Sequence, residues 1–159
     1  MHPALSVIAF TVLSGAGFGL VLLVAVLDRL APGLIELSAT ETLTAGILGV
    51  VLATAGLLAS TLHLANPKNA WRAFSRFRSS WLSREGVFSV AFYPFAVVWL
   101  GATAFPGVLS GWPVTAAAAV AAALAAATLF STGMIYASLR TIPQWHSPLV
   151  PTNYITLGL

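Results

Sequence analysis

Long apolar stretches separated by short polar ones run through the whole sequence. Four of them reach the roughly 20 apolar residues that a helix needs to cross a bilayer. They predict spanning helices over about 4–27, 43–64, 86–105 and 114–139, and a fifth apolar run begins at about 154. The pattern predicts an all-α integral membrane protein. It is a helical bundle of four full transmembrane helices plus the start of a fifth, in one transmembrane domain over 1–159.

Composition agrees with this pattern and excludes soluble classes of protein. The chain has 159 residues, of which 58% are hydrophobic and 7% are charged, whereas soluble domains carry about 25% charged residues. The mean hydropathy of +0.93 is the opposite of what disorder requires. The pI near 10.0 rests on a net charge of only +3, so nucleic-acid binding is not indicated. Without cysteine, the chain has no disulfide and no thiolate ligand for an iron–sulfur cluster.

The few charges are divided unequally between the two ends of the predicted spans. One end carries six basic residues, whereas the other carries only Arg29, together with Asp28, Glu36 and Glu41. Because cytoplasmic loops carry an excess of Lys and Arg, the N-terminus and the basic loops are predicted to be cytoplasmic. The basic residues at that end are Lys68, Arg72, Arg76, Arg78, Arg84 and Arg140.

The basic connection between the second and third spans has an amphipathic pattern. Asn66 and Pro67 form a typical helix start, and aromatic residues recur after it at helical spacing, among them Trp71 and Phe74. We expect a basic interfacial helix over about 67–80 that contacts anionic headgroups. Two alternatives remain open: a docking surface for a peripheral subunit, or one wall of a pocket for an amphiphilic ligand.

Small residues in the second span recur at alternating steps of three and four, so they lie on one helix stripe. Such a stripe lets another helix approach closely in lipid, and we interpret it as a packing seam. Because His63 continues the series, it is predicted to face protein. Pro94 predicts a kink in the third span. The stripe comprises Gly46, Gly49, Ala53, Gly56 and Ser60.

Two ionisable residues at the basic membrane boundary are candidates for chemistry. Glu85 is the only acid at this end, and His63 lies at the same boundary on the preceding span. Ionisable residues at membrane depth are functional candidates by default, and this pair can accept and release protons. The alternative is that Glu85 only supports a helix start capped by Ser83.

Haem and metal sites are not indicated. A bis-histidine haem needs two inward-facing histidines on different spans, and of His2, His63 and His146 only His63 lies in one. A zinc site needs four ligands, which the chain supplies only if distant residues converge. We therefore expect no haem and no metal in this chain.

Short motifs along the whole chain resemble those of the dimethyl sulfoxide reductase membrane-anchor family, which includes the membrane subunits of sulfite-oxidising molybdoenzymes. The run from Ser79 to Glu85, Ser-Ser-Trp-Leu-Ser-Arg-Glu, is the most specific of them. Family members are about twice as long, so this chain resembles their N-terminal half. Further matches are His2-Pro3-Ala4, Ser14–Gly17, His63–Pro67, Ala70–Phe74, Met134–Leu139, Gln144–His146 and Pro151–Tyr154.

The resemblance implies a haem-free, non-catalytic subunit in a bacterial or archaeal cytoplasmic membrane. Its partners would be an iron–sulfur subunit and a molybdopterin catalytic subunit, and it would exchange electrons with quinone or menaquinone in anaerobic respiration or sulfur metabolism. The direction of electron flow is not encoded. If the basic side is cytoplasmic and carries the partners, the sulfite-oxidising type is favoured.

The resemblance also assigns candidate site residues. The family's quinol-site histidine and glutamate correspond to His63 and Glu85, which would handle protons, while Arg72 or Arg84 would orient the headgroup. Residues that would line the pocket are Trp71, Trp81, Ser83, Trp145 and His146. Two other interpretations remain: a purely structural anchor, or half of a small-solute transporter.

Overall fold

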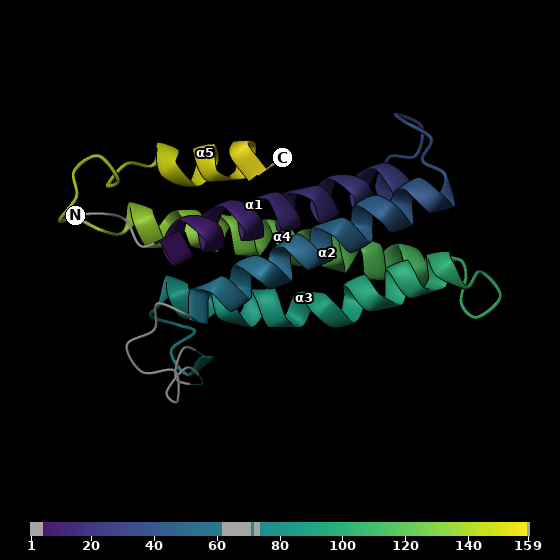
Figure 1. The fold of residues 1–159 in the computed structure, drawn as a ribbon, viewed down its shortest axis with the longest axis horizontal. Coiled ribbons are helices and arrows are strands. Elements are labelled where there is room, and N and C mark those ends of the chain that lie inside the picture. Colours follow the sequence, from purple (N-terminus) through teal and green to yellow (C-terminus); the bar gives the residue numbers. More distant parts are fainter. Residues whose placement is uncertain (1–4, 62–70, 72–73, 159) are drawn as a thin grey trace.

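The structure, a computed structural model, describes residues 5–61, 71 and 74–158, and all of its regular elements are helices. Figure 1 shows the four longest helices side by side, with a short fifth helix against the bundle. In chain order the elements are α1 (Leu5–Ala25), the π-helix η1 (Val26–Leu30), α2 (Ala39–Thr61), α3 (Trp81–Ala104), α4 (Trp112–Ala137) and α5 (Leu149–Gly158).

Four segments have the length and composition to cross a membrane: α1 with η1, α2, α3 and α4. The predicted all-α membrane bundle is therefore confirmed. Successive helices run in opposite directions, so the α3 start and the α4 end meet at one end of the bundle (Figure 1). We call this the basic end, and the other, which holds η1 and the α3–α4 connection, the acidic end.

Capping residues move two helix starts away from the predicted positions. The second span begins at Ala39 instead of about 43, because Ser38 and Glu41 form a capping box: the Ser38 amide donates to Glu41 Oε2 at 2.8 Å, and the Glu41 amide donates to Ser38 Oγ at 3.2 Å. The third span begins at Trp81 instead of about 86. Its cap is Ser80, so the expectation that Ser83 caps this helix is wrong.

The predicted packing seam is confirmed between α1 and α2. A Cβ added at Gly17 would overlap the backbone nitrogen of Ala53 and lie 2.6 Å from the Gly49 carbonyl oxygen. One added at Gly56 would lie 2.9 Å from the Cα of Ser14. The two backbones are therefore close enough that only glycine fits, which is how small residues drive helix association in lipid.

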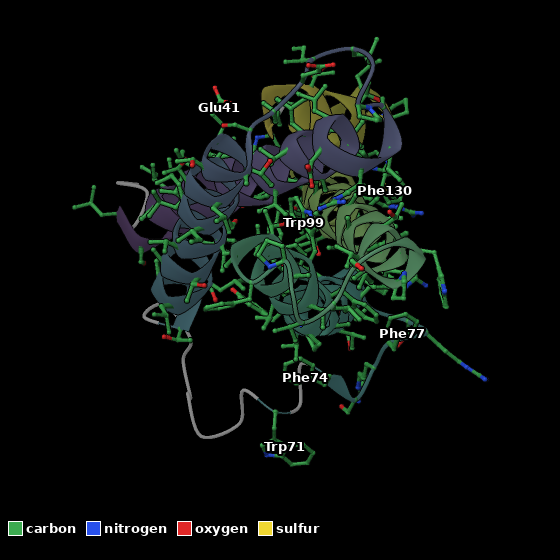
Figure 2. The ribbon with its side chains drawn as sticks, turned by 90° about the vertical axis from the view of Figure 1, so that its right-hand side faces the viewer. Glu41, Trp71, Phe74, Phe77, Trp99 and Phe130 are labelled. Carbon is green, nitrogen blue, oxygen red and sulfur yellow. The ribbon has the colours of Figure 1, made fainter. Side chains whose placement is uncertain are left out.

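The core between the helices is aromatic at its centre. Phe18 of α1 and Phe92 of α3 meet edge to face, with ring centroids 5.2 Å apart. Trp99 is fully buried and lies at the middle of the bundle when the molecule is viewed from its end (Figure 2). The third span, α3, is a single helix that continues through Pro94.

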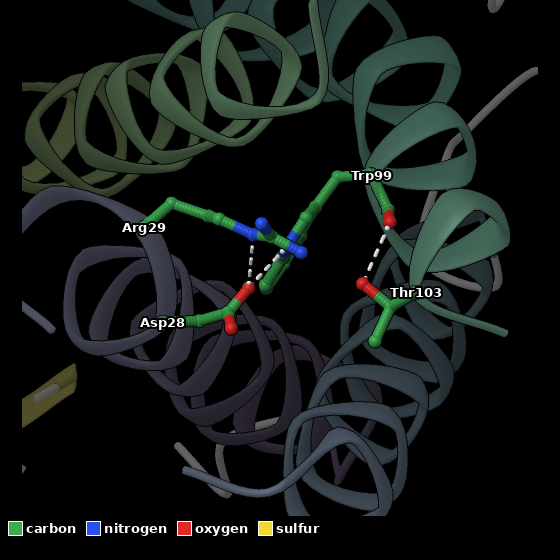
Figure 3. A network of polar contacts seen from close by, with 4 residues as sticks. All are labelled: Asp28, Arg29, Trp99 and Thr103. Carbon is green, nitrogen blue, oxygen red and sulfur yellow. Dashed lines mark hydrogen bonds and ion pairs between the residues drawn. The ribbon is translucent and has the colours of Figure 1, made fainter. Parts of the chain in front are cut away.

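The acidic end is closed by a polar network around Asp28 (Figure 3). Asp28 Oδ2 accepts hydrogen bonds from Arg29 Nε and from Trp99 Nε1, each at 2.8 Å. The sequence pattern placed both charged residues in a connection, but they lie in η1, which extends α1 by a further turn. Because Trp99 belongs to α3, the network joins the first span to the third.

The predicted interfacial helix over 67–80 does not continue to its predicted end: Trp71 and Phe74 have 3-10 helical conformation, but the residues described after Phe74 are not helical until α3 begins. Residues 75–79 form turns, in which the amides of Ser79 and Ser80 both bond the Arg76 carbonyl. Trp71 projects away from the bundle (Figure 2), whereas Phe77 packs on Phe88 of α3 with centroids 5.6 Å apart. The other residues of the predicted helix, 67–70 and 72–73, lie outside the described residues.

Candidate functional site

Glu85 is buried at the basic end of the bundle, with 4% of its surface exposed. Its carboxyl oxygen Oε1 is hydrogen-bonded to the hydroxyl of Thr132 on α4, a residue that is itself 3% exposed. The same hydroxyl lies 3.0 Å from the carbonyl oxygen of Thr128, one turn earlier in α4. An acid, a hydroxyl and a carbonyl therefore form a short chain between α3 and α4.

This chain satisfies Glu85 both with and without its proton. A threonine hydroxyl has one hydrogen and two acceptor lone pairs. When Glu85 is ionised, Thr132 donates to the carboxylate. When Glu85 is protonated, its own O–H donates to Thr132, which then donates to the Thr128 carbonyl. A buried carboxyl whose Oε1 has a partner in each state can take up and release a proton without losing that hydrogen bond.

Two tyrosines near this chain belong to α4 and α5. Tyr136 and Tyr154 stack with ring centroids 6.2 Å apart. The Tyr154 hydroxyl donates to the Thr11 carbonyl of α1 at 3.1 Å. Hydrogen bonds and ring contacts at the basic end thus join α3 to α4 and join α5 to both α4 and α1.

A hollow of about 510 Å³ opens on the outer face of α3 and α4, beside this chain. We call it the α3/α4 hollow. Four of its lining residues are aromatic, and two carry guanidinium groups. Trp81 and Phe88 lie about one turn before and after Glu85 along α3, and Ser131 directly precedes Thr132. The lining residues are Phe77, Arg78, Trp81, Arg84, Phe88, Ala127, Phe130 and Ser131.

Arg84 holds the rim of this hollow together. Its Nε donates to the Phe77 carbonyl at 3.0 Å, and its Nη2 donates to the Arg78 carbonyl at 2.9 Å. The guanidinium carbon lies 4.1 Å from the ring centroid of Trp81. These contacts fix the turn before α3, and they use two of the N–H donors of Arg84.

Replacing Arg84 with methionine is expected to loosen the turn that it holds. The variant keeps a long apolar side chain against Trp81 but loses both hydrogen bonds to the turn carbonyls. Amide hydrogen exchange measured by mass spectrometry should become at least about threefold faster in peptides covering 74–80, since each hydrogen bond contributes about 1 kcal/mol. Arg76→Met, at an exposed position in the same segment, is the matched control. Equal exchange in the two variants would contradict this role for Arg84.

A second hollow, of about 520 Å³, lies between the end of α4 and α5. Phe130 lines both hollows and separates them. His146 lies in this second one, with Nδ1 2.8 Å from the Ala137 carbonyl oxygen. Since a carbonyl only accepts, Nδ1 carries the proton and Nε2 of a neutral His146 has a free lone pair. Its other lining residues are Met134, Ala137, Ser147, Pro148, Pro151, Thr152 and Ile155.

The structure brings only some of the predicted site residues together. Trp81 and Arg84 line the α3/α4 hollow next to buried Glu85, whereas His146 lines the other hollow. Trp145 packs on Tyr136, with centroids 5.2 Å apart, and lines neither. Ser83, two residues before Glu85 in the sequence, is buried, whereas Trp71 is exposed. His63 and Arg72 lie outside the described residues.

Sequence reasoning missed the α4 half of this site. Thr132, Ser131 and Phe130 lie near the end of an alanine-rich span, which shows no amphipathic phase from which a facing side could be inferred. The only available signal was the Ser-Thr pair itself, since two adjacent hydroxyls interrupt an otherwise apolar run. Within the described part of the chain, no group of three or more His, Cys, Asp or Glu residues gathers as a metal site would require.

A bundle of four apolar helices long enough to cross a membrane, with few charges, defines a multi-pass integral membrane protein. The chain matches the family model described as DMSO reductase anchor subunit (DmsC) over residues 1–159, and it belongs to this family. It is 35% identical over 169 residues to a sulfite dehydrogenase subunit from Allochromatium vinosum. The alignment covers 99% of this chain and 52% of that protein, so the chain spans about half the length of this relative. No solved structure gives a significant match.

Proposed function

We propose that this subunit passes electrons between membrane quinone and the iron–sulfur subunit of a molybdopterin oxidoreductase. The observation that carries the proposal is the buried Glu85–Thr132 pair beside the α3/α4 hollow. Membership of the anchor family supports the partners, which are an iron–sulfur subunit and a molybdopterin catalytic subunit. The similarity to a subunit of sulfite dehydrogenase favours the sulfite-oxidising type, in which quinone is the electron acceptor.

The chemistry needs a proton carrier next to the quinone ring. Reduction of a quinone to a quinol consumes two electrons and two protons, and the reverse reaction releases them. The electrons come from, or go to, the clusters of the partner subunit. Glu85 supplies or accepts one proton, and Thr132 keeps its carboxyl hydrogen-bonded before and after the transfer. His63 is the proposed second proton carrier, and Arg72 the proposed contact to the headgroup.

The charge distribution supports an orientation in the cytoplasmic membrane. Arg76, Arg78, Arg84 and Arg140 all lie toward the basic end, where Glu85 is buried. By the positive-inside rule this end faces the cytoplasm. The partner subunits are then cytoplasmic and dock at the end of the bundle where the quinone would bind.

Glu85→Gln in the assembled complex is expected to lower quinone-coupled turnover by at least about 100-fold, because general acid–base groups contribute on that order or more. The amide keeps the shape and a hydrogen bond to Thr132 but carries no transferable proton. Sulfite oxidation with a soluble artificial electron acceptor, which bypasses the membrane subunit, should be unchanged. Glu36→Gln, at an exposed acid toward the opposite end of the bundle, is the control. Unchanged quinone-coupled turnover in Glu85→Gln would overturn the proposal and leave a purely structural anchor.

A further inference from the structure

Hydroxyl groups in the spans mostly bond to their own helix. Ser14, Ser89 and Thr128 each donate to the carbonyl four residues earlier, at 2.6 to 2.8 Å. Ser131 does not follow this pattern. It is 1% exposed, and its Oγ has no hydrogen-bond partner. In a membrane segment, where water is scarce, an unpaired hydroxyl is costly, so this donor is suited to a ligand.

Ser131 lines the α3/α4 hollow, so the other residues of this hollow indicate what kind of ligand it would bind. Two other buried hydroxyls without partners, Thr42 and Ser83, line neither hollow. The residues around Ser131 supply hydrogen-bond donors and aromatic rings, and none of them is an acid. Such a lining suits a flat, mostly apolar ring that carries an oxygen acceptor.

The same contacts favour a quinone ring over the phosphate of an anionic lipid. A phosphate would be held by guanidinium donors, and Arg84 gives two of its N–H groups to backbone carbonyls. Because Arg78 also lines the hollow, the preference for a ring rests on the aromatic lining. Four aromatic side chains line the hollow, and two of them, Trp81 and Phe130, meet edge to face with centroids 5.7 Å apart. Aromatic walls provide stacking surfaces for a planar ring.

We infer that Ser131 donates a hydrogen bond to a carbonyl oxygen of a quinone ring held in the α3/α4 hollow. The inference rests on the proposed function. It adds where the quinone ring binds and which residue donates a hydrogen bond to it. Ser131 directly precedes Thr132 on α4, so a ring bonded to Ser131 lies on the outer side of the helix pair whose inner side holds Glu85. The hydroxyl would therefore hold the ring one residue along α4 from Thr132, the hydrogen-bond partner of Glu85.

Ser131→Ala in the assembled complex tests this placement. The KM for decylubiquinone is expected to rise about 3- to 10-fold with a smaller change in kcat, as for one lost hydrogen bond. The infrared C=O stretch of bound decylubiquinone should lose its downshifted, hydrogen-bonded component. Ser14→Ala is the matched control, since it makes the same change at a buried position of α1, away from the hollow and from Glu85, and it should leave both measurements unchanged.

Three outcomes would overturn the inference, and they can be told apart. If Ser131→Ala keeps the wild-type KM and infrared spectrum while Glu85→Gln loses turnover, the quinone binds elsewhere and the proposed function stands. If native mass spectrometry shows that Ser131→Ala releases bound phosphatidylglycerol but binds decylubiquinone normally, the hollow is a lipid site. If the wild-type complex binds no decylubiquinone and Glu85→Gln has no effect, the proposed function fails together with the inference.

Discussion

Replacing Gly17 with alanine is expected to lower the thermal stability of the protein by several degrees. The added methyl group would overlap the backbone nitrogen of Ala53 and lie 2.6 Å from the Gly49 carbonyl oxygen. Both obstacles are backbone atoms, so no side-chain rotation relieves the overlap and α1 must move away from α2. Overpacking of this kind typically costs about 1–3 kcal/mol, and the loss of contact along the seam adds to it.

The chain offers a matched control for this substitution. Gly101 is also in a spanning helix, but a Cβ added there has no atom within 4 Å. Gly101→Ala should therefore keep or raise the melting temperature, because alanine is the better helix former by about 1 kcal/mol. Melting of the detergent-solubilised protein, followed by fluorescence, compares the two. Equal melting temperatures for Gly17→Ala and Gly101→Ala would show that the α1–α2 approach does not limit stability.

The second large effect is expected for Asp28→Ala at the acidic end. Two donors, Arg29 Nε and Trp99 Nε1, lose their common acceptor, and Trp99 is fully buried. Removing one partner of a buried ion pair costs about 3–5 kcal/mol. Because the side chains of Arg29 and Asp28 are 32% and 13% exposed, solvent screening lowers the expected cost to about 2–3 kcal/mol.

A double-mutant cycle with Trp99→Phe separates the bond between the two spans from the local ion pair. Trp99→Phe keeps an aromatic ring but removes the indole N–H, so Asp28 loses this bond and keeps the one from Arg29. The cavity that the smaller ring leaves is present in the single and the double variant, so its cost cancels in the cycle. Unfolding free energies from denaturant titration should show a smaller loss for the double variant than the sum of the two single losses, by about 1 kcal/mol. Strict additivity would mean that this bond contributes nothing to joining α1 with α3.

The spans were predictable because hydropathy alone reports them, whereas their ends depend on particular side chains. Ser38 and Ser80 start α2 and α3 earlier than the apolar runs suggest. The predicted interfacial helix fails over 75–79 for a related reason. Arg84 binds the carbonyls of Phe77 and Arg78, and Ser80 is extended in order to cap α3, so a continuous helix is interrupted.

The candidate site was predictable on one helix only. Glu85 was identified because it is the single acid at the basic end, and an isolated charge at membrane depth is conspicuous. Its partner Thr132 lies 47 residues away in sequence, and no local pattern reports such a contact. At the acidic end, the charges of Asp28 and Arg29 led to a wrong prediction of where the first span ends. Asp28 and Arg29 look like connection residues, but each neutralises the other and Trp99 completes the network, so they lie within a helix.

The contact between α1 and α5 has a consequence for how the protein is made. Tyr154 bonds to Thr11 across 143 residues of sequence, and a side chain at Gly19 would overlap the backbone of Gly158. The ribosome delivers α1 first among these helices and α5 last. When α1 and α2 have been synthesised, one flank of α1 therefore still lacks its partner. That flank is filled only after α5 has been made, so the complete bundle cannot form before the last of these helices is synthesised.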